Sequence, residues 1–241
     1  MPPPEAFLHS QAIDNKRISP KRPARRIWAG HVGYDRGQEI QKRLVAERQV
    51  GAVPDTLLLL EHPLTYTIGR SGGENNLLVP EREIEALGGT VHRVDRGGDI
   101  TFHGPGQLVG YPIVDLNDHY RDVHRYLRDL EEVLIRVLAR WRLRADRVAG
   151  LSGVWVGQDK VAAMGVHVSK WVTSHGFALN VSTDLTHFGR IIPCGISDRG
   201  VTSMERLLGK NLTLMEVAEA TAEEFAVVFG VSWEPDKWVP V

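Results

Sequence analysis

Cysteine is almost absent from this sequence: Cys194 is the only one in 241 residues. A single cysteine excludes an intramolecular disulfide and a zinc site built from several thiolates. Apolar runs are also short, and none approaches the roughly 20 residues that a membrane-spanning helix requires. The formal net charge of −1 gives no general reason to expect nucleic acid as a partner. We therefore expect a cytoplasmic protein that engages neither membrane nor nucleic acid.

Residues 1–26 differ from the rest of the chain because they are rich in proline, lysine and arginine. They show neither helical nor strand periodicity. They lack the continuous apolar core of a signal peptide, and their prolines disfavour the amphipathic helix of a transit peptide. The pattern predicts a flexible basic arm, either without a role of its own or holding an acidic partner. Residues 27–241 are expected to form one domain, since strand and helix patterns alternate there without a long linker.

Strand-like and helix-like segments follow one another from Ile27 onward. Strands are expected at 26–32, 55–63, 65–69, 107–116 and 175–181, and a hairpin at 153–169 turning at 157–159. Helices are expected at 35–51, 80–89, 123–141 and 214–230. Thr213 and Glu216 have the spacing of a capping box before the last of these helices. The mixture predicts an α/β fold of the α+β type.

The segment 95–107, DRGGDITFHGPGQ, places four glycines in an expected loop between two strands. Glycines at this density let backbone N–H groups approach a ligand closely. The segment lacks the lysine followed by serine or threonine of a phosphate-binding loop, and it does not open a helix as a dinucleotide fingerprint does. It is therefore either an ordinary turn or part of a different kind of ligand site.

Lys160 begins an expected strand whose alternation places it on one face with Ala162 and Met164. The ordinary interpretation is an ammonium that reaches water from the end of the strand. The functional interpretation is a lysine held in a cleft beside a group that it activates. His175, at the start of the next strand, is in the ordinary case a structural histidine with its hydrogen bonds satisfied.

Cys194 lies between a proline and a glycine at the end of an apolar run, where a packing cysteine is unusual. A thiol attacks carbonyl groups as the thiolate, and a neighbouring cation lowers the thiol pKa. If Lys160 approaches Cys194, it supplies that cation and then acts as acid and base while an acyl group passes on and off the sulfur. The alternative is an inert buried thiol.

Four segments carry a resemblance to a known family: RGGDITFHGPGQLVGYPI (96–113), KVAAMGVHVS (160–169), HGFALNV (175–181) and PCGI (193–196). In this order and separation they resemble the octanoyltransferases of lipoate biosynthesis, and the resemblance extends from about Ile27 to beyond Ser203. It implies the fold of biotin and lipoate protein ligases, with a mixed central sheet flanked by helices. It also implies that Cys194 carries an acyl thioester and that Lys160 lowers the pKa of the thiol.

The resemblance further implies that three segments contact the substrate. These residues are Arg96, Gly97, Gly98, Asp99, Ile100, Thr101, Phe102 and His103, then Ala163, Met164 and Gly165, and finally Gly176, Phe177 and Ala178. Phe102 stands where the family often has tyrosine or tryptophan, and His167 stands where arginine is common. These two differences bear on the fit of the carrier or on the acyl chain length.

The implied reaction moves an octanoyl group from octanoyl-acyl carrier protein to Cys194. The group then passes to the ε-amino group of a lysine on lipoyl domains of 2-oxoacid dehydrogenases and on the glycine cleavage H protein. Because the thioester arrives activated, no ATP is required, and neither a cofactor nor a metal is implied. We expect the enzyme to act as a monomer.

Three other functions stay open on the sequence. An ATP-dependent lipoate or octanoate ligase of the same fold would also carry the glycine-rich segment and a lysine, although it has no use for a thiol. A thioester hydrolase would pair Cys194 with His103 or His175. A non-catalytic module would bind acyl groups or their carrier and leave Cys194 unreactive.

Arginines recur at spacings that place them along one side of the long helix, from just before its expected start at 123. They are Arg121, Arg125, Arg128, Arg136 and Arg140. The ordinary interpretation is a solvated face balanced by the acidic residues of the same helix. The functional one is a docking site for an acidic acyl carrier protein.

Overall fold

The computed structural model describes residues 21–192, 199–235 and 238–239. The strands are β1 (Arg22–His31), β2 (Asp55–Glu61), β3 (Thr65–Ile68), β4 (Thr90–Arg93), β5 (Ile100–His103), β6 (Gln107–Ile113), β7 (Asp146–Val148), β8 (Leu151–Val156), β9 (Asp159–Ser169), β10 (Val172–Asn180) and β11 (Val231–Trp233). The α-helices are α1 (Tyr34–Gln49), α2 (Glu81–Ala86), α3 (Val123–Arg140), α4 (Met204–Leu208) and α5 (Leu214–Phe229). Two 3-10 helices, η1 (Glu74–Asn76) and η2 (Leu185–Arg190), complete the described elements.

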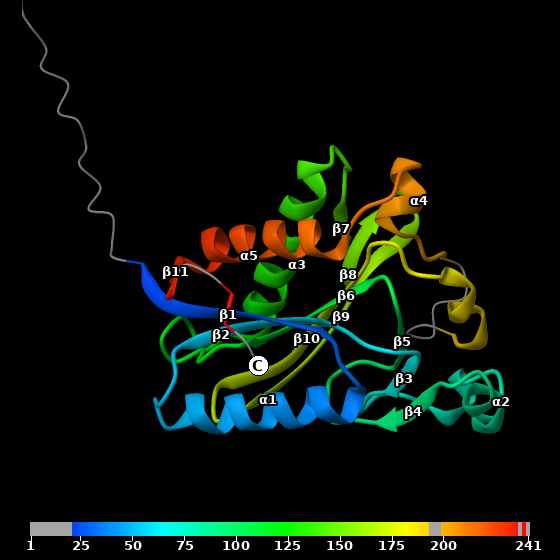
Figure 1. Cartoon of the computed structure of the whole chain (residues 1–241), viewed down its shortest axis with the longest axis horizontal. Coiled ribbons are helices and arrows are strands. Elements are labelled where there is room, and N and C mark those ends of the chain that lie inside the picture. The colour runs from blue at the N-terminus through cyan, green and yellow to red at the C-terminus, as the bar shows by residue number, and fades with distance from the viewer. Residues whose placement is uncertain (1–20, 193–198, 236–237, 240–241) are drawn as a thin grey trace, which may run out of the picture.

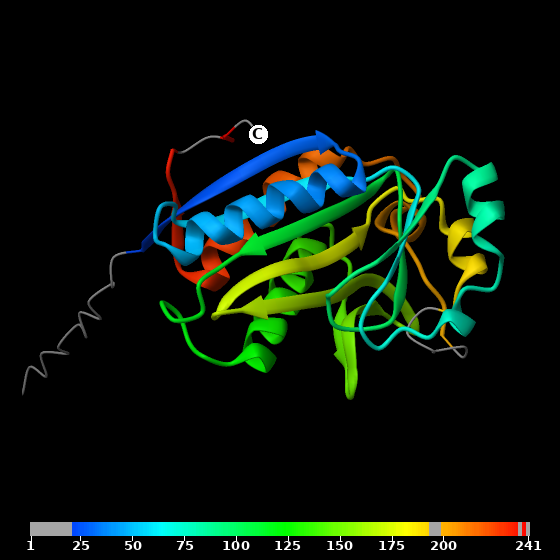
Figure 2. The same ribbon diagram turned by 90° about the horizontal axis from the view of Figure 1, so that it is seen from below.

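A mixed eight-stranded sheet with the order β11-β1-β2-β6-β10-β9-β8-β7 forms the centre of the molecule. Strand β1 runs parallel to both β11 and β2, whereas the other neighbours in this sheet are antiparallel. Helices α3 and α5 lie on one face of the sheet and α1 lies on the other (Figure 1). The view from below shows α1 running along its face of the sheet (Figure 2). The protein therefore has three layers.

The apolar run of β2 shows why this sheet needs cover on both faces. Leu57 and Leu59 belong to the core beneath α3 and α5, while Leu58 and Leu60 belong to the core beneath α1. All four are fully buried. A strand in a two-sided core reads as a continuous apolar run because both sets of alternating side chains leave water.

The helices follow the expected patterns closely. Seven buried residues of α3 recur at helical spacing, and α3 packs against α5 over the sheet. The capping box before α5 is present: the Thr213 side chain accepts from the Glu216 N–H, and the Glu216 carboxylate accepts from the Thr213 N–H. The expected helices at 35–51, 80–89, 123–141 and 214–230 are thus confirmed, with shifts of a few residues at their ends.

A second sheet of three strands, with the order β4-β3-β5, stands at one end of the large one. It has its own small core, which includes Tyr66, Ile100 and Phe102 and is closed by residues of α2 and η2. The expected strands at 55–63 and 65–69 both form, but they belong to different sheets. Pro63 therefore lies where the chain crosses from one sheet to the other.

Two expectations are changed by pairing between distant segments. Strand β1 begins at Arg22 and pairs with β11 and β2, so residues 22–26 of the expected arm are part of the large sheet. Residues 1–20 lie outside the described part of the chain. Within the expected loop 95–107, residues 100–103 form β5 because their backbone groups pair with β3. Local sequence cannot reveal either pairing, since the partner strands are remote in the chain.

Candidate active site

The glycine-rich segment packs directly onto strand β9. The Gly97 N–H donates to the Val166 carbonyl over 2.9 Å. A Cβ on Gly165 would lie 2.7 Å from the Gly97 carbonyl oxygen, closer than real Cβ atoms come. Gly98 adopts a φ of +85°, which favours glycine. These glycines thus allow two backbones to touch, and the residues beside them are brought next to β9 and β10.

A cavity lies between this segment, β5 and the paired strands β9 and β10. Most of the residues predicted to contact substrate line it. They are Arg96, Gly98, Asp99, Ile100, Thr101, His103, Ala163, Met164, Gly165, Gly176, Phe177 and Ala178. Three segments that are separate in the sequence therefore form one concave surface.

Phe102 and Gly97 are predicted contact residues that do not line the cavity. Because side chains alternate along β5, Thr101 and His103 face the cavity and Phe102 faces the opposite side. The Phe102 ring packs 5.3 Å from the Tyr66 ring, measured between centroids, in the small core. Its difference from the tyrosine or tryptophan common in the family therefore lies in this core. The Gly97 backbone N–H is hydrogen-bonded to β9.

Tyr34, Tyr111 and Ser152 line the cavity although no sequence pattern singled them out. Tyr34 is the first residue of α1, and Tyr111 lies in the middle of β6, so both belong to segments that look like scaffold. Both tyrosines are buried. A tyrosine in an apolar segment is a weak signal at best, since it packs in a core as readily as it lines a site.

Hydrogen bonds hold the polar side chains around the glycine-rich segment in place. The Arg96 guanidinium donates through Nη2 to the Thr67 carbonyl at 2.7 Å and to the Thr67 hydroxyl at 2.8 Å. His103 Nδ1 lies 2.8 Å from the Gln107 side-chain oxygen. Burial lowers the pKa of His103 to about 3. The His103 ring is therefore neutral at pH 7.

His175 lines the same cavity and is held by Asp95. Its Nε2 lies 2.9 Å from the Asp95 carboxylate, and its backbone N–H donates to the Gln41 side chain. Burial lowers the pKa of His175, and the Asp95 carboxylate opposes this effect without cancelling it. His167 Nε2 lies 3.7 Å from the Asp95 carboxylate. His175 is thus a satisfied histidine, as its ordinary interpretation states, but one that also forms part of the cavity wall.

Lys160 is buried, with 6% of its surface exposed. A smaller cavity shares Thr101, Ala163 and Ala178 with the main one and has Lys160 in its wall. The Lys160 Nζ lies 4.8 Å from the centroid of the Trp155 ring, close enough for a cation–π contact. The ordinary interpretation of a lysine that reaches water is therefore wrong, and the lysine lies in a cleft.

Lys160 also lies on a different face of β9 from the one that strict alternation along the strand predicts. The register between β8 and β9 shifts, because Val154 pairs with Ala162 while Trp155 pairs with Lys160. Such a bulge inserts one extra residue and reverses the alternation beyond it. Lys160 consequently shares a cavity with Ala163 and not with Ala162 or Met164.

Cys194 lies outside the described residues, within the segment 193–198. The chain on either side of that segment is anchored near the cavity. The Ile192 N–H donates to the Asn76 carbonyl at 2.9 Å, and Asn76 donates through its side chain to Asp99 of the cavity wall. On the other side, the Lys160 N–H donates to the Gly200 carbonyl at 2.9 Å.

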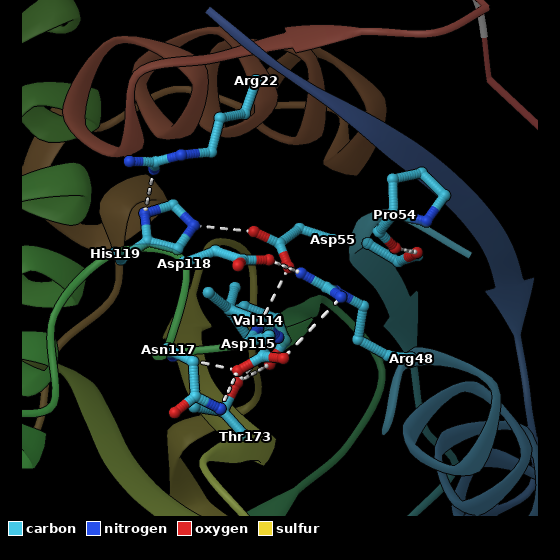
Figure 3. Close-up of polar contacts among 12 residues, drawn as sticks. Arg22, Arg48, Pro54, Asp55, Val114, Asp115, Asn117, Asp118, His119 and Thr173 are labelled. Atoms are coloured by element: carbon cyan, nitrogen blue, oxygen red, sulfur yellow. Dashed lines mark hydrogen bonds and ion pairs between the residues drawn. The ribbon is translucent and has the colours of Figure 1, made fainter. Parts of the chain in front are cut away.

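A second polar cluster lies where β2 begins, and it is built differently (Figure 3). The Asp55 cluster consists of Arg22, Arg48, Asp55, Asp118 and His119. Arg48 Nε donates to Asp55 over 2.8 Å, and His119 Nε2 lies 2.7 Å from the other Asp55 oxygen. Arg22 donates to His119 Nδ1, and Arg48 also pairs with Asp118. The cluster joins α1, β2 and the segment after β6.

The arginine row of α3 is engaged by neighbouring side chains. The pairs are Arg121 with Asn117, Arg125 with Asp129, Arg128 with Glu131, Arg136 with Glu132, and Arg140 with Glu223 and Glu224. This pattern supports the ordinary interpretation of a balanced, solvated face.

Within 21–192, 199–235 and 238–239, no three His, Cys, Asp or Glu side chains are grouped so that they could hold a metal ion. No helix in that part of the chain has the length and apolar character needed to cross a membrane.

The fold and the site define a protein class. Residues 34–226 match the family model described as the lipoyl protein ligase A/B catalytic domain. A bipartite lipoate protein ligase from Thermoplasma acidophilum has the same fold, with a TM-score of 0.66 and 15% identity over 91% of this chain and 88% of that one. A biotin protein ligase from Aquifex aeolicus has a TM-score of 0.54 and 16% identity over 85% and 70% of the two chains. The predicted fold class is confirmed.

Sequence relatives identify the branch of this class. The octanoyltransferase of Solibacter usitatus is 50% identical over 86% of this chain and 93% of its own length. The octanoyltransferase of Rubrobacter xylanophilus is 49% identical over 91% and 95% of the two chains. The chain therefore belongs to the octanoyltransferase family.

Proposed function

We propose that this chain catalyses octanoyl transfer in protein lipoylation through a thioester on Cys194, with Lys160 as the proton donor and acceptor. The donor is octanoyl-acyl carrier protein, and the acceptor is a lysine ε-amino group on a lipoyl domain. The family membership supports the reaction. The observation that supports the residue roles is the burial of Lys160 at a cavity wall, beside the chain that follows the segment 193–198.

Chain connectivity supports the pairing of the two residues. Cys194 follows Ile192 by two positions, a chain length of at most about 7 Å. Ile192 is tied to Asn76, which in turn donates to Asp99 in the cavity wall. Lys160 lines the smaller cavity, which shares Thr101, Ala163 and Ala178 with the main one. A thiol at position 194 thus belongs to a short segment whose two flanks are hydrogen-bonded beside this cavity wall and beside Lys160.

The chemistry proceeds in two acyl transfers. In the first, the Cys194 thiolate attacks the thioester carbonyl of the donor, a new C–S bond forms, and the carrier thiolate leaves with a proton from the Lys160 ammonium. In the second, the acceptor amine attacks the Cys194 thioester, a C–N bond forms, and the cysteine leaves as thiolate. The neutral Lys160 amine accepts the proton that the acceptor nitrogen loses. Both residues return to their starting states.

The cavity is suited to an apolar acyl chain. Ala163, Met164, Phe177 and Ala178 are apolar residues of its lining, and binding a hydrocarbon chain there removes it from water. The polar side chains nearby, among them Arg96 and His103, already have hydrogen-bond partners in the protein. These side chains therefore border the site, and they need no polar group of the substrate to satisfy their hydrogen bonds.

The relatives favour transfer over the ATP-dependent alternative. Octanoyltransferases are 49–50% identical over most of the chain, whereas the lipoate protein ligase shares the fold at 15% identity. A thiol nucleophile also has no role in forming an acyl-adenylate. The hydrolase and the non-catalytic module are separated from the transferase by the following experiment.

The test is intact-protein mass spectrometry after octanoyl-acyl carrier protein is mixed with the wild type, Cys194→Ser or Lys160→Ala. The expected result is one octanoyl adduct on the wild type that hydroxylamine removes, that moves to an added lipoyl domain, and that is absent from Cys194→Ser. Release of free octanoate without a modified lipoyl domain would identify a hydrolase. Modification only with ATP and free octanoate would identify a ligase, and no reaction under any condition would identify a binding module.

A further inference from the structure

The two ends of the cavity differ in chemistry. At one end, Thr101, Ala163 and Ala178 lead into the smaller cavity that has Lys160 in its wall. At the other end, the lining includes the rings of Tyr34, Tyr111 and His175. These three residues are called the end wall. An acyl chain whose carbonyl is beside Lys160 and that follows the main cavity extends toward these rings.

The floor between the two ends is formed by small residues. Ala163 pairs with Ala178 across β9 and β10, and Gly165 pairs with Gly176 two positions further along. None of these four residues has a side chain larger than a methyl group, and all four line the cavity, while the room beside the two glycines is taken by the Gly97 and Gly110 carbonyls. A Cβ on Gly176 would lie 2.2 Å from the Gly110 carbonyl, so this part of the path cannot gain a side chain without moving β6.

The end wall is buried and fixed by hydrogen bonds. Each of its three residues is at most 6% exposed. The Tyr111 hydroxyl lies 2.8 Å from His62 Nε2, and His175 Nε2 lies 2.9 Å from Asp95. The Tyr34 ring lies 5.0 Å from the His62 ring between centroids, and Tyr111 lies 6.2 Å from His175. These contacts make one connected group, so no ring can move aside without breaking contacts with the others.

The length of the path matches an acyl chain of medium length. His175 precedes Ala178 by three residues on β10, a distance of about 10 Å at about 3.3 Å per residue. An extended chain of eight carbons is about 9 Å long, given C–C bonds of about 1.5 Å. Two further methylenes would reach the rings of the end wall.

We propose that the end wall of Tyr34, Tyr111 and His175 sets the length of the acyl chain that this enzyme transfers. The proposal rests on the proposed function, since it takes the reacting carbonyl to lie at the Lys160 end. A chain of eight carbons fills the path, whereas longer chains must displace rings that hydrogen bonds hold in place. Shorter chains leave part of the apolar path empty and lose about 0.8 kcal/mol of burial per methylene, a factor of about four in affinity.

The decisive variant is Tyr34→Ala. Tyr34 is the first residue of α1, so its side chain can be removed without interrupting a strand of the sheet. Octanoyl-, decanoyl- and dodecanoyl-acyl carrier protein compete for limiting enzyme, and the products on a lipoyl domain are quantified by mass spectrometry. We expect the wild type to favour octanoyl over decanoyl by about tenfold or more and Tyr34→Ala to bring this ratio near or below one. Tyr34→Leu, which removes less of the ring volume, gives an intermediate ratio.

Two controls separate wall removal from loss of stability. Tyr34→Phe keeps the ring and retains the wild-type preference. Tyr126→Leu removes another buried tyrosine, which packs against Phe229 in the core beneath α3 and α5. This substitution lowers the melting temperature but leaves the ratio between chain lengths unchanged, because the ratio compares substrates on the same folded enzyme.

The outcomes distinguish this inference from the proposed function. If the wild type transfers octanoyl groups and both folded Tyr34→Ala and Tyr34→Leu keep its chain preference, the end wall does not set the length and the inference is overturned. If the wild type transfers no acyl group of any length, the proposed function itself fails. A shift in Tyr126→Leu equal to that in Tyr34→Ala would also overturn the inference.

Discussion

Arg48 and Lys160 are both cations with little exposed surface, Lys160 buried and Arg48 partly buried, but their surroundings differ. Arg48 lies 2.8 Å from Asp55 and 3.8 Å from Asp115, and it also contacts Asp118 (Figure 3). Lys160 borders a cavity, with its ammonium 4.8 Å from the centroid of the Trp155 ring. The first cation is enclosed by carboxylates that join separate elements of the fold. The second is presented to a space that a substrate can occupy.

This difference shows how burial of charge serves two purposes. Removing one partner from a closed ion cluster leaves an uncompensated buried charge, which is strongly destabilising. Removing a cation from the wall of a cavity costs the fold little, and under the proposed function it takes away the group that transfers protons. Substitutions in the Asp55 cluster should therefore lower stability and leave activity unchanged. Substitution of Lys160 should lower activity and leave stability unchanged.

The largest expected effect is on activity, for Lys160→Met. Methionine keeps an unbranched side chain of similar length but cannot transfer a proton, so we expect kcat/KM for octanoyl transfer to fall at least about 100-fold. Urea denaturation should show a free energy of unfolding that is equal to that of the wild type or higher. A loss of stability that parallels the loss of activity would remove the contrast between Lys160 and Arg48.

Asp55→Asn tests the other side of the comparison. It keeps the shape of the side chain but removes the charge that faces Arg48, and we expect it to lower the free energy of unfolding by about 3 kcal/mol. Activity of the folded fraction should not change. Asp118→Asn is the matched control, because its more exposed carboxylate contacts the same Arg48 and should contribute less than about 1 kcal/mol. Equal effects of the two substitutions would contradict the assignment.

Gly153→Ala tests how the bulge positions Lys160. Gly153 has a φ of +125°, and an added Cβ would lie 2.8 Å from the Ala162 carbonyl and 3.3 Å from Lys160 Cε. The strained backbone should cost about 1–2 kcal/mol of stability. The displaced lysine should lower kcat/KM about tenfold. Gly157→Ala in the adjacent turn is the control, since its φ is also positive but its Cβ meets no neighbouring atom within 4 Å. A similar loss of activity in both variants would show that Lys160 is not positioned by close contact with Gly153.

The smallest expected effect is a two-stage dependence of the melting temperature on pH. Burial lowers the pKa of His62 to about 4, below the usual value of about 6.5. Between about pH 6.5 and 4 the unfolded chain therefore binds more protons than the folded chain. Stability decreases as the pH falls through that range. Burial raises the pKa of Asp55, but hydrogen bonds from His119, the Asp115 N–H and Arg48 outweigh it and leave the pKa low. Its stabilisation is present above about pH 4 and is lost as pH falls through the lowered pKa.

Two variants assign these stages. Thermal unfolding of His62→Asn should show a weaker decrease between pH 6.5 and about 4 than the wild type. Asp55→Asn should keep that decrease and show a smaller further one below about pH 4, to which the lowered pKa of His103 still contributes. Curves that parallel the wild type in both variants would contradict the assignment.

The sequence predicted those features that depend on local pattern. The apolar spacing of residues 123–141 indicated the long helix, and Thr213 with Glu216 indicated the start of the last one. The apolar run of β2 indicated a buried strand. The spacing of the glycine-rich segment, Lys160 and Cys194 indicated the family, and the relatives bear this out. The roles of Lys160 and Cys194 stay predictions for the mass-spectrometry experiment.

Other features required the folded chain. Strand β5 forms inside an apparent loop because β3 supplies its partner, and β1 begins within an apparent arm because β11 and β2 do. Pairing of this kind depends on contacts between distant segments, which no local pattern contains.

The sequence by itself determined the amphipathic helices, the apolar strands and the chemical types of the residues that are proposed to react, because these depend on spacing and on side-chain chemistry. The tertiary structure alone decided that Lys160 is buried, since a bulge in β9 turns it into a cavity. It also decided that Tyr34 and Tyr111 line one cavity with His175. The physical reason is that burial and cavity shape arise from packing between remote segments, whereas periodicity records only which face of its own element a residue occupies.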